Sequence, residues 1–479
     1  MFGSIHEECG VFGIYEGKRA DVASSVYFGL YALQHRGQES CGIAVCDDGV
    51  ISHKKAEGLV SEVFDREELR RLGKGDMAVG HVRYSTTGGQ NHNNIQPLVI
   101  RHIKGNMALV HNGNLINAAE LRRDFELSGA IFHGTSDTEA IAFAIVRERL
   151  GCGSTEEAVR RAMPKIKGAY SCILMTATKL IAFRDPFGFR PLCVGKTHDG
   201  AYVIASESCA LETVGAEYLR DVEPGEVLVI GERGLRSLKA DCVCENKICI
   251  FEYIYFARPD SVIQGVSVHH ARMKAGRLLA KNSPANADIV IGVPDSGLDA
   301  ALGYSDESNI PYGIGFIKNK YIGRSFIQPE QNRRESAVKI KLNVIKETVA
   351  GKRVIMIDDS IVRGTTSARI VRLLRDAGAK EVHVRISSPP FMHSCYFGTD
   401  IDSEENLIAS RCNRIEDIAE YIGADSLSFL PLESLGELID STGFCHGCFS
   451  GDYPVDIKGA GGKDKFDEKI HKSTVGNGE

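Results

Sequence analysis

The sequence has no long apolar run and no targeting segment. Nowhere do about 18 uncharged apolar residues occur in a row, which excludes a predicted membrane-spanning helix. The first eight residues, MFGSIHEE, lack both the basic start and the apolar stretch of a secretory signal. We therefore expect a cytoplasmic protein with no membrane partner.

The chain also has no excess of basic charge. Its 479 residues carry a net charge of -6, with 43% hydrophobic and 25% charged residues. Such a chain lacks the positive field that nucleic acids and anionic surfaces favour, so no nucleic-acid partner is expected and any anion site must be local. At about 150 residues per domain, the length allows two to four domains.

Fourteen cysteines are present, but a disulfide framework is not expected, because the cytoplasm keeps thiols reduced. Most lie singly in apolar runs, as Cys172 and Cys193 do, and are interpreted as small buried side chains. Cys445 and Cys448 form a C-x-x-C pair that fits zinc, an iron-sulfur cluster, a redox pair or chance. Spacing alone does not identify further ligands.

The two halves of the chain differ in their pattern of predicted strands and helices. Up to residue 245 short strands are broken by Gly, Asn and Asp, which predicts an α+β domain with antiparallel sheet over 9–245. Ser154 and Glu157 predict a capping box at the start of one helix. Over 246–450 apolar strands alternate with helices, which predicts an α/β domain with a parallel sheet. Residues 451–479 are rich in Gly and Lys and are expected to form a mobile tail.

The segment VIMIDDSIVRGTTS, residues 354–367, joins a buried strand to a helix. The strand ends in Asp358 and Asp359, and Gly364 leads to Thr365 and Thr366 at the helix start. N–H groups and hydroxyls there can cradle a phosphate, while the carboxylates can take ribose hydroxyls or Mg²⁺. The alternatives are a response-regulator acid pocket and an ordinary capped strand end.

This segment resembles the signature of type I phosphoribosyltransferases, and GVPDSG at 292–297 resembles their pyrophosphate loop. The basic run 318–334 suits a mobile lid, although such a run is usually a solvated face. The resemblance implies one magnesium ion per subunit, held by Ser296, Asp358 and Asp359. It implies that phosphoribosyl pyrophosphate is bound by Asp295, Ser296, Gly297, Lys318, Lys320, Asp358, Asp359, Ser360, Ile361, Val362, Arg363, Gly364, Thr365 and Thr366.

Cys9 opens the first predicted strand, and five motifs follow it in order: LQHRGQES (33–40), GHVRYSTTG (80–88), VHNGNL (110–115), HGTSDTEA (133–140) and RDPFGFRPL (184–192). Together they resemble the class II glutamine amidotransferase domain. That resemblance implies an N-terminal-nucleophile fold, an αββα sandwich of two antiparallel sheets between helices.

The resemblance gives Cys9 the role of nucleophile toward glutamine. Removal of residues 1–8 as a propeptide would free its α-amine, which with a pKa of about 7.7 to 8.0 is a suitable base. The implied oxyanion donors are the Asn112 side chain and the Gly113 N–H. Further implied glutamine contacts are Arg83 to the carboxylate, Asp137 to the ammonium, and Arg36 and Tyr84, which organise the site. A structural Arg83–Asp137 salt bridge is the alternative.

The two halves together, over about 9–455, resemble the glutamine phosphoribosylpyrophosphate amidotransferase family. The implied reaction converts glutamine, phosphoribosyl pyrophosphate and water to 5-phosphoribosylamine, glutamate and pyrophosphate, the committed step of purine synthesis. Ammonia is expected to pass internally. The family also implies a homotetramer and feedback inhibition by purine nucleotides. Rivals are other class II amidotransferases and a regulator that binds DNA, but no basic helix-turn-helix segment is found.

The same resemblance implies a [4Fe-4S] cluster on Cys249, Cys395, Cys445 and Cys448, as a structural staple. Cys242 and Cys244 are alternative ligands, and zinc is the rival metal at such a set.

Overall fold

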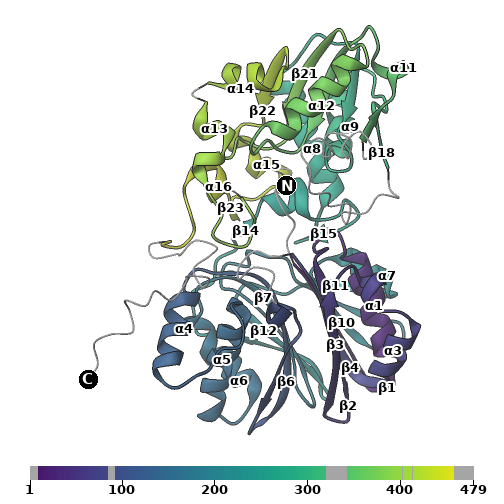
Figure 1. Cartoon of the computed structure of the whole chain (residues 1–479). Helices are drawn as coiled ribbons and strands as arrows, with labels where there is room; N and C mark the ends of the chain where they lie inside the picture. Colours follow the sequence, from purple (N-terminus) through teal and green to yellow (C-terminus); the bar gives the residue numbers. More distant parts are fainter. Residues whose placement is uncertain (1–8, 85–91, 320–341, 402, 413, 458–479) are drawn as a thin grey trace. The chain divides into compact units, whose positions relative to one another are not determined.

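The computed structural model describes residues 9–84, 92–319, 342–401, 403–412 and 414–457, which form two compact units (Figure 1). The N-terminal unit contains the described residues up to Ile248, the segment Tyr396–Thr399 and residues 455–457. The C-terminal unit contains Cys249–Cys395 and Asp400–Pro454. The chain thus passes between units at residue 248, close to the predicted boundary. The predicted propeptide, most of the lid and residues 458–479 of the tail lie outside the described residues.

The N-terminal unit contains two antiparallel sheets, as the sequence predicts. The larger has the order β11-β9-β10-β1-β4-β2-β3 and the smaller the order β13-β12-β8-β7-β6-β5. The strands of the larger sheet are β1 (Gly10–Ala20), β2 (Ser40–Asp47), β3 (Val50–Glu57), β4 (Gly75–Arg83), β9 (Cys193–Thr197), β10 (Tyr202–Ala205) and β11 (Ala216–Asp221). Those of the smaller sheet are β5 (Leu98–His102), β6 (Gly105–Leu115), β7 (Gly168–Met175), β8 (Leu180–Arg184), β12 (Glu226–Gly231) and β13 (Gly234–Lys239).

Three apolar cores lie between the layers of this unit. Alternate residues of β1 show the pattern: Val11 packs between the sheets, whereas Phe12 and Ile14 pack under helices. The helices on that side are α1 (Val22–Ala32), α2 (Val60–Val63), α3 (Arg66–Leu72) and α7 (Ser208–Thr213). The smaller sheet is covered by α4 (Ala118–Leu127), α5 (Asp137–Leu150) and α6 (Thr155–Ala162) (Figure 1). The predicted αββα sandwich is confirmed.

Helix α6 begins where the sequence predicts, but only half of the capping box forms. The Ser154 hydroxyl accepts the Glu157 N–H at 3.3 Å. The Glu157 carboxylate instead accepts from Arg160 at 2.9 Å and Arg161 at 2.7 Å, because two guanidinium groups within one turn compete successfully with a backbone amide.

The C-terminal unit contains the predicted parallel sheet, in the order β17-β20-β21-β22. Its strands are β17 (Ile289–Gly292), β20 (Arg353–Asp358), β21 (Glu381–Ile386) and β22 (Ser426–Phe429). Both faces are buried: Val354 and Met356 pack against α12 (Thr365–Asp376) and α14 (Ile415–Ile422), while Ile355 and Ile357 are also fully covered. Helices α8 (Val268–Asn282) and α9 (Gly297–Ser308) pack on each other, and α9 packs on β17 and β20.

Short elements complete this unit. Strand β14 (Ile248–Cys249) pairs with β23 (Phe444–Cys445), and a π-helix follows at Glu252–Phe256. The buried Arg272 of α8 fixes that π-helix by donating to the carbonyls of Tyr253 and Ala257 at 2.9 and 2.7 Å. The others are β15 (Val262–Ile263), β16 (Val266–Ser267), β18 (Phe316–Lys318), β19 (Leu342–Val344), α11 (Lys346–Val349), α13 (Ile408–Arg411), α15 (Leu435–Ile439) and α16 (Gly447–Ser450). In the part of the chain described, no helix is both long and apolar enough to cross a membrane.

The segment Tyr396–Thr399, here called the inserted segment, belongs to the N-terminal unit although its neighbours on both sides belong to the other. The Phe397 ring stacks on Phe189, with centroids 4.2 Å apart. The buried guanidinium of Arg190 donates to the Phe397 carbonyl at 2.9 and 3.1 Å. The Asn114 amide donates to the Tyr396 carbonyl at 2.7 Å. These contacts place the inserted segment against the end of β6.

Candidate active sites

Cys9 lies directly before β1, where that strand pairs with the end of β4. Gly10 is opposite Val82, so Cys9 comes to the level of Arg83 and Tyr84. The Cys9 thiol, only 7% exposed as a residue, donates to the Tyr84 carbonyl at 3.6 Å. Arg83 is also buried, at the last position of β4. Strand pairing therefore brings together three residues that the sequence assigns to the glutamine site.

Arg36 reaches the same place from the loop after α1. Its Nε donates to the Cys9 carbonyl at 3.1 Å, and the guanidinium is fully buried. The loop lies very close to β4, since a Cβ added at Gly37 would lie 2.6 Å from the Arg83 nitrogen. Glycine at position 37 is thus required for Arg36 to reach the main chain of Cys9.

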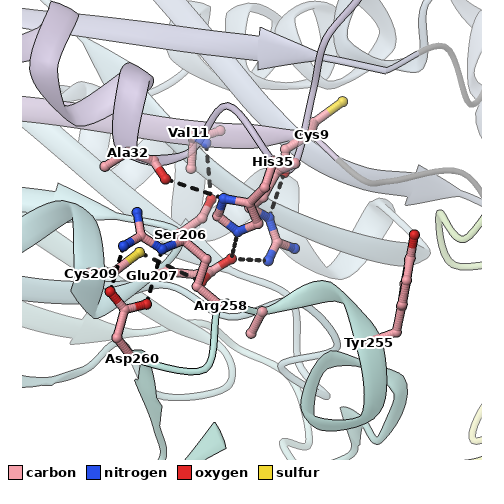
Figure 2. Close-up of polar contacts among 12 residues, drawn as sticks. Cys9, Val11, Ala32, His35, Ser206, Glu207, Cys209, Tyr255, Arg258 and Asp260 are labelled. Atoms are coloured by element: carbon pink, nitrogen blue, oxygen red, sulfur yellow. Dashed lines mark hydrogen bonds and ion pairs between the residues drawn. The ribbon is translucent and has the colours of Figure 1, made fainter. Parts of the chain in front are cut away.

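Glu207, which the sequence analysis did not identify, is the anionic partner of Arg36. Its Oε1 accepts from Arg36 Nη1 at 2.6 Å and lies 2.8 Å from His35 Nε2 (Figure 2). Burial alone would raise the pKa of the Glu207 carboxyl, but the neighbouring His35 and Arg36 hold that pKa far below its usual range. The available signal was an acid two residues after the apolar strand YVIA, and ordinary strand ends also carry acids at such positions.

The proposed oxyanion donors lie near the end of β6. Asn112 is 1% exposed, and its Nδ2 has no hydrogen-bond partner among the described residues. Gly113 has φ +138°, and a Cβ there would lie 2.1 Å from the Ala169 carbonyl oxygen. The backbone at this point accepts only glycine, and the preceding side chain keeps an unused buried donor.

Asp137 is the first residue of α5 and is tied to the same strand end. Its Oδ2 accepts the Leu115 N–H at 2.9 Å, and its Oδ1 lies 3.5 Å from His111 Nδ1. His81 of β4 bonds the His111 carbonyl at 3.0 Å and so joins the two sheets immediately before Asn112. Burial lowers the pKa of His81 to about 3, which keeps its ring neutral. The predicted glutamine-site residues therefore gather at one end of the sandwich.

The second site lies at the ends of β17 and β20. The Asp359 carboxylate accepts from the hydroxyls of Ser296 and Ser360, each at 2.5 Å. Asp358 is buried, and burial, followed by the charge of Asp359, raises its pKa well above the usual value. Gly297 permits this approach, since a Cβ there would lie 2.5 Å from the Ile357 carbonyl oxygen. Two crowded carboxylates beside a hydroxyl fit a Mg²⁺ ion, which uses one or two carboxylates plus substrate oxygens.

The loop that follows can bind a phosphate through its backbone. Ile361 and Val362 are buried, and the Val362 carbonyl accepts the Ile408 N–H at 2.8 Å, so their side chains belong to the core. Gly364, with φ +77°, caps α12, and a Cβ there would lie 2.4 Å from Ile408 Cδ1. The buried Thr366 hydroxyl has no partner in the described part of the chain. These features leave N–H groups and a hydroxyl available at a helix start.

The remaining predicted residues are less well defined. Lys318 and Asp295 are both exposed and form an ion pair at 2.5 Å. Arg363 is half-buried in the loop before Gly364, and Thr365 is exposed at the first turn of α12. Lys320 lies outside the described residues.

The four cysteines predicted as cluster ligands all belong to the C-terminal unit. Burial raises the pKa of Cys448 well above the usual value, and the nearby thiols of Cys395, Cys249 and Cys445 raise it further. Even so, no group of three or more His, Cys, Asp or Glu arranged to hold a metal ion occurs among the residues described. The alternative ligands Cys242 and Cys244 lie in the other unit, with their sulfurs 3.8 Å apart. The thiols of Cys249, Cys395, Cys445 and Cys448 thus lie near one another, but the described residues do not place them in the geometry of a metal site.

Comparison with known proteins identifies a family for each unit. Residues 81–213 match the family described as glutamine amidotransferase domain, and 267–387 match the phosphoribosyl transferase domain. Amidophosphoribosyltransferase from Bacillus subtilis is 49% identical over 460 residues, covering 95% of each chain. The Methanocaldococcus jannaschii protein of that name is 48% identical over 464 residues, covering 94% of this chain and 98% of its own.

Solved structures give the same result. Glutamine phosphoribosylpyrophosphate amidotransferase from B. subtilis, complexed with ADP and GMP, matches with a TM-score of 0.87 at 48% identity, covering 94% of this chain and 98% of its own. Identity of this extent, over nearly the full length of both chains, shows that the chain belongs to the amidophosphoribosyltransferase family.

Proposed function

We propose that this chain is a glutamine-dependent pentosyltransferase that makes 5-phosphoribosylamine, glutamate and pyrophosphate from glutamine, phosphoribosyl pyrophosphate and water. The reaction commits material to purine synthesis. One observation carries the glutamine half: Cys9 lies beside the end of β4, whose His81 bonds the His111 carbonyl of β6, and the next residue, Asn112, holds a buried donor without a protein partner in the described residues. The phosphoribosyl half rests on the acids and the phosphate-binding loop after β20.

In the N-terminal unit, the Cys9 sulfur attacks the side-chain carbonyl carbon of glutamine. Asn112 Nδ2 and the Gly113 N–H stabilise the oxyanion that forms, while Arg83 and Asp137 hold the α-carboxylate and α-ammonium. The C–N bond breaks, and ammonia leaves with a proton returned by the α-amine of the mature Cys9. Water then hydrolyses the thioester to glutamate and restores the thiol.

In the C-terminal unit, ammonia forms a bond to ribose C1 as the bond from C1 to pyrophosphate breaks. Asp358, Asp359 and Ser296 would hold one Mg²⁺ ion, which when bound supplies positive charge to the departing pyrophosphate. The loop 360–366 and the start of α12 hold the 5-phosphate. Asp295, Lys318 and Lys320 act on the pyrophosphate side. Ammonia passes internally, because ammonia released into water at neutral pH is mostly ammonium.

Further parts of the proposal follow from family membership and the residues present. Residues 1–8 are a propeptide whose removal frees the Cys9 amine. A [4Fe-4S] cluster with a structural role is held by Cys249, Cys395, Cys445 and Cys448. The effect of the other three thiols on the pKa of Cys448 supports this, since it requires them to lie nearby. The enzyme is a cytoplasmic homotetramer inhibited by purine nucleotides. The B. subtilis structure solved with ADP and GMP supports the nucleotide inhibition.

The decisive experiment is Cys9→Ala. Glutamine-dependent formation of phosphoribosylamine is expected to be lost, while formation from concentrated ammonia remains, because the C-terminal site is intact. Cys46→Ala is the control and is expected to keep both activities. Cys46 is a buried cysteine of β2 opposite Met77, at the end of the strand away from Arg83. Loss of both activities in Cys9→Ala with unchanged folding contradicts the assigned role.

Processing is tested separately by intact mass and N-terminal sequencing of active protein. The proposal expects a chain beginning at Cys9. An active chain that still begins at Met1 would remove the α-amine as the base.

A further inference from the structure

We propose that Glu207 is a positioning residue for glutamine cleavage, which through Arg36 fixes the main chain of Cys9 in its reactive orientation. This inference rests on the proposed function, in which Cys9 is the nucleophile. Glu207 belongs to none of the five motifs that identify the glutamine site. Among the described contacts, its carboxylate meets His35, Arg36 and Cys209 and not the Cys9 sulfur.

The connection consists of two short contacts in series. Glu207 Oε1 accepts from Arg36 Nη1 at 2.6 Å, and Arg36 Nε donates to the Cys9 carbonyl at 3.1 Å. Both charged side chains have 0% exposure, so water cannot replace either contact. A guanidinium is planar and rigid. When Glu207 holds Nη1 of Arg36, the direction of the Nε–H bond toward the Cys9 carbonyl is therefore also restricted.

Backbone pairing explains why Glu207 lies at this point. Strand β10 pairs antiparallel with β1, so the residues after β10 return beside the start of β1. Ser206 N–H donates to the Val11 carbonyl at 3.0 Å, and the Ser206 hydroxyl accepts the Val11 N–H at 2.9 Å. Ser206 therefore holds residue 11 (Figure 2). Glu207 acts on residue 9 through Arg36.

The orientation of Cys9 matters because one residue carries both reactive groups. Its thiol and, in the mature chain, its α-amine are attached to the same Cα, and the Cys9 carbonyl is attached there too. Holding the carbonyl restricts rotation of the backbone at Cys9. A displacement of about 1 Å at a reacting group can lower a rate about 10²-fold.

The charge of Glu207 is needed as well as its shape. Glu207→Gln retains an oxygen that can accept from Arg36, but it removes the negative charge that lies against the buried guanidinium. His35 Nε2, 2.8 Å from the same oxygen, would face a neutral amide instead of a carboxylate. Arg36 would then no longer be held in one direction against Cys9.

A second carboxylate–arginine pair in the N-terminal unit provides a control. The buried Glu226 of β12 is 3% exposed and accepts at 2.7 and 2.8 Å from Arg220 of β11, whose side chain is 38% exposed. Glu226→Gln also removes a buried carboxylate that pairs with an arginine, at a place outside the residues assigned to the glutamine site. It reports the effect of such a loss on folding alone.

The experiment compares Glu207→Gln, Glu207→Asp and Glu226→Gln in the full-length mature enzyme. For Glu207→Gln, kcat for glutamine hydrolysis is expected to fall about 10- to 100-fold. KM for glutamine should change little, because Arg83 and Asp137 are untouched, and ammonia-dependent synthesis should be retained. Alkylation of Cys9 by iodoacetamide, followed by peptide mass across a range of pH, should slow in parallel with kcat.

Glu207→Asp keeps the charge and is expected to recover part of kcat; it also carries the test if Glu207→Gln does not fold. Glu226→Gln is expected to keep wild-type kcat and alkylation. Equal kcat in Glu207→Gln and Glu226→Gln, or equal loss of both activities with a lowered Tm, would show a purely structural role. A wild-type enzyme that cleaves no glutamine would instead overturn the proposed function, and this inference with it.

Discussion

Asn112 retains a buried side-chain donor that no described residue satisfies. An unsatisfied buried polar group costs about 1 to 3 kcal/mol, so a fold keeps one mainly where a ligand uses it. Because Asn112 lies next to Gly113, we expect its free donor to bind the oxyanion that forms in the proposed reaction.

Asn112→Ala is therefore expected to lower kcat for glutamine hydrolysis about 10²- to 10³-fold, because one oxyanion donor is lost. Steady-state kinetics with glutamine and with ammonia measures this, and the ammonia-dependent rate should be unchanged. Asn106→Ala, an exposed asparagine at the other end of β6, is the control. A wild-type kcat in Asn112→Ala would exclude the side chain as a donor.

Asp358 predicts a pH effect whose sign follows from its raised pKa. The folded protein keeps a proton on this carboxyl above the unfolded-state pKa near 3.8, so its stability falls as pH rises from there through the raised pKa. Asp358→Asn removes the buried charge. In magnesium-free buffer, the variant should have a higher Tm than the wild type near neutral pH, with a smaller difference in acid.

Thermal unfolding in the presence of a chelator, repeated across pH, checks this expectation. Synthesis from glutamine or ammonia should be lost in Asp358→Asn, since the proposed Mg²⁺ site would lose a ligand. Asp376→Asn, at the exposed end of α12, should leave Tm and both rates unchanged. A Tm of Asp358→Asn below that of the wild type at neutral pH would contradict the buried-charge argument.

At the scale of strands and helices, hydrophobic pattern predicted most of the fold. Strands such as β1, β7, β17 and β20 are apolar runs bounded by glycine or acid, and local sequence specifies them. Strand β4 was not predicted as a strand, although it lies at the centre of its sheet between β1 and β2. Only its last four residues, GHVR, were interpreted, and these as part of a motif, because pairing partners cannot be inferred from one strand.

Contacts between distant segments could not be predicted at all. Glu207 follows a short strand as many surface acids do, and only the pairing of β10 with β1 brings it to Arg36. Similarly, nothing in the letters YFGT indicates that they pack beside Asn114, which lies 282 residues away from Tyr396. Motifs identified the residues proposed to touch substrate, whereas the residues that hold them in place could be found only from the tertiary structure.

The inserted segment gives a prediction at this scale. Phe397→Ala removes a ring that is 2% exposed and stacked on Phe189, so the free energy of unfolding should fall by about 3 to 5 kcal/mol. Because the segment packs at the end of β6, hydrogen exchange near Asn114 should accelerate and kcat for glutamine hydrolysis should fall. Phe125→Ala, a buried ring of α4, is the control for stability loss without change in kcat. Equal kinetic effects of the two variants would contradict a specific role for the segment.

At the scale of the whole molecule, the proposed cluster ligands Cys249, Cys395, Cys445 and Cys448 lead to a prediction of the iron content. Anaerobically purified protein should contain about four irons per chain and be brown, as a cluster with four thiolate ligands requires. Cys448→Ser should lose iron and lower Tm, whereas Cys244→Ser, at an exposed position, should not. Iron analysis and absorption spectra test this. Colourless protein with one zinc per chain would correct the assignment of the metal.

The inserted segment has a consequence for dividing the chain. A polypeptide that stops at Ile248 would lack the carbonyls that Arg190 and Asn114 bind, and would expose the face of Phe189 to water. Such a fragment is expected to aggregate or hydrolyse glutamine poorly, and a synthetic peptide spanning residues 391–401 should restore it in trans. The residues of the N-terminal unit therefore do not form one continuous stretch of the chain, and a cut at residue 248 does not separate the two units cleanly.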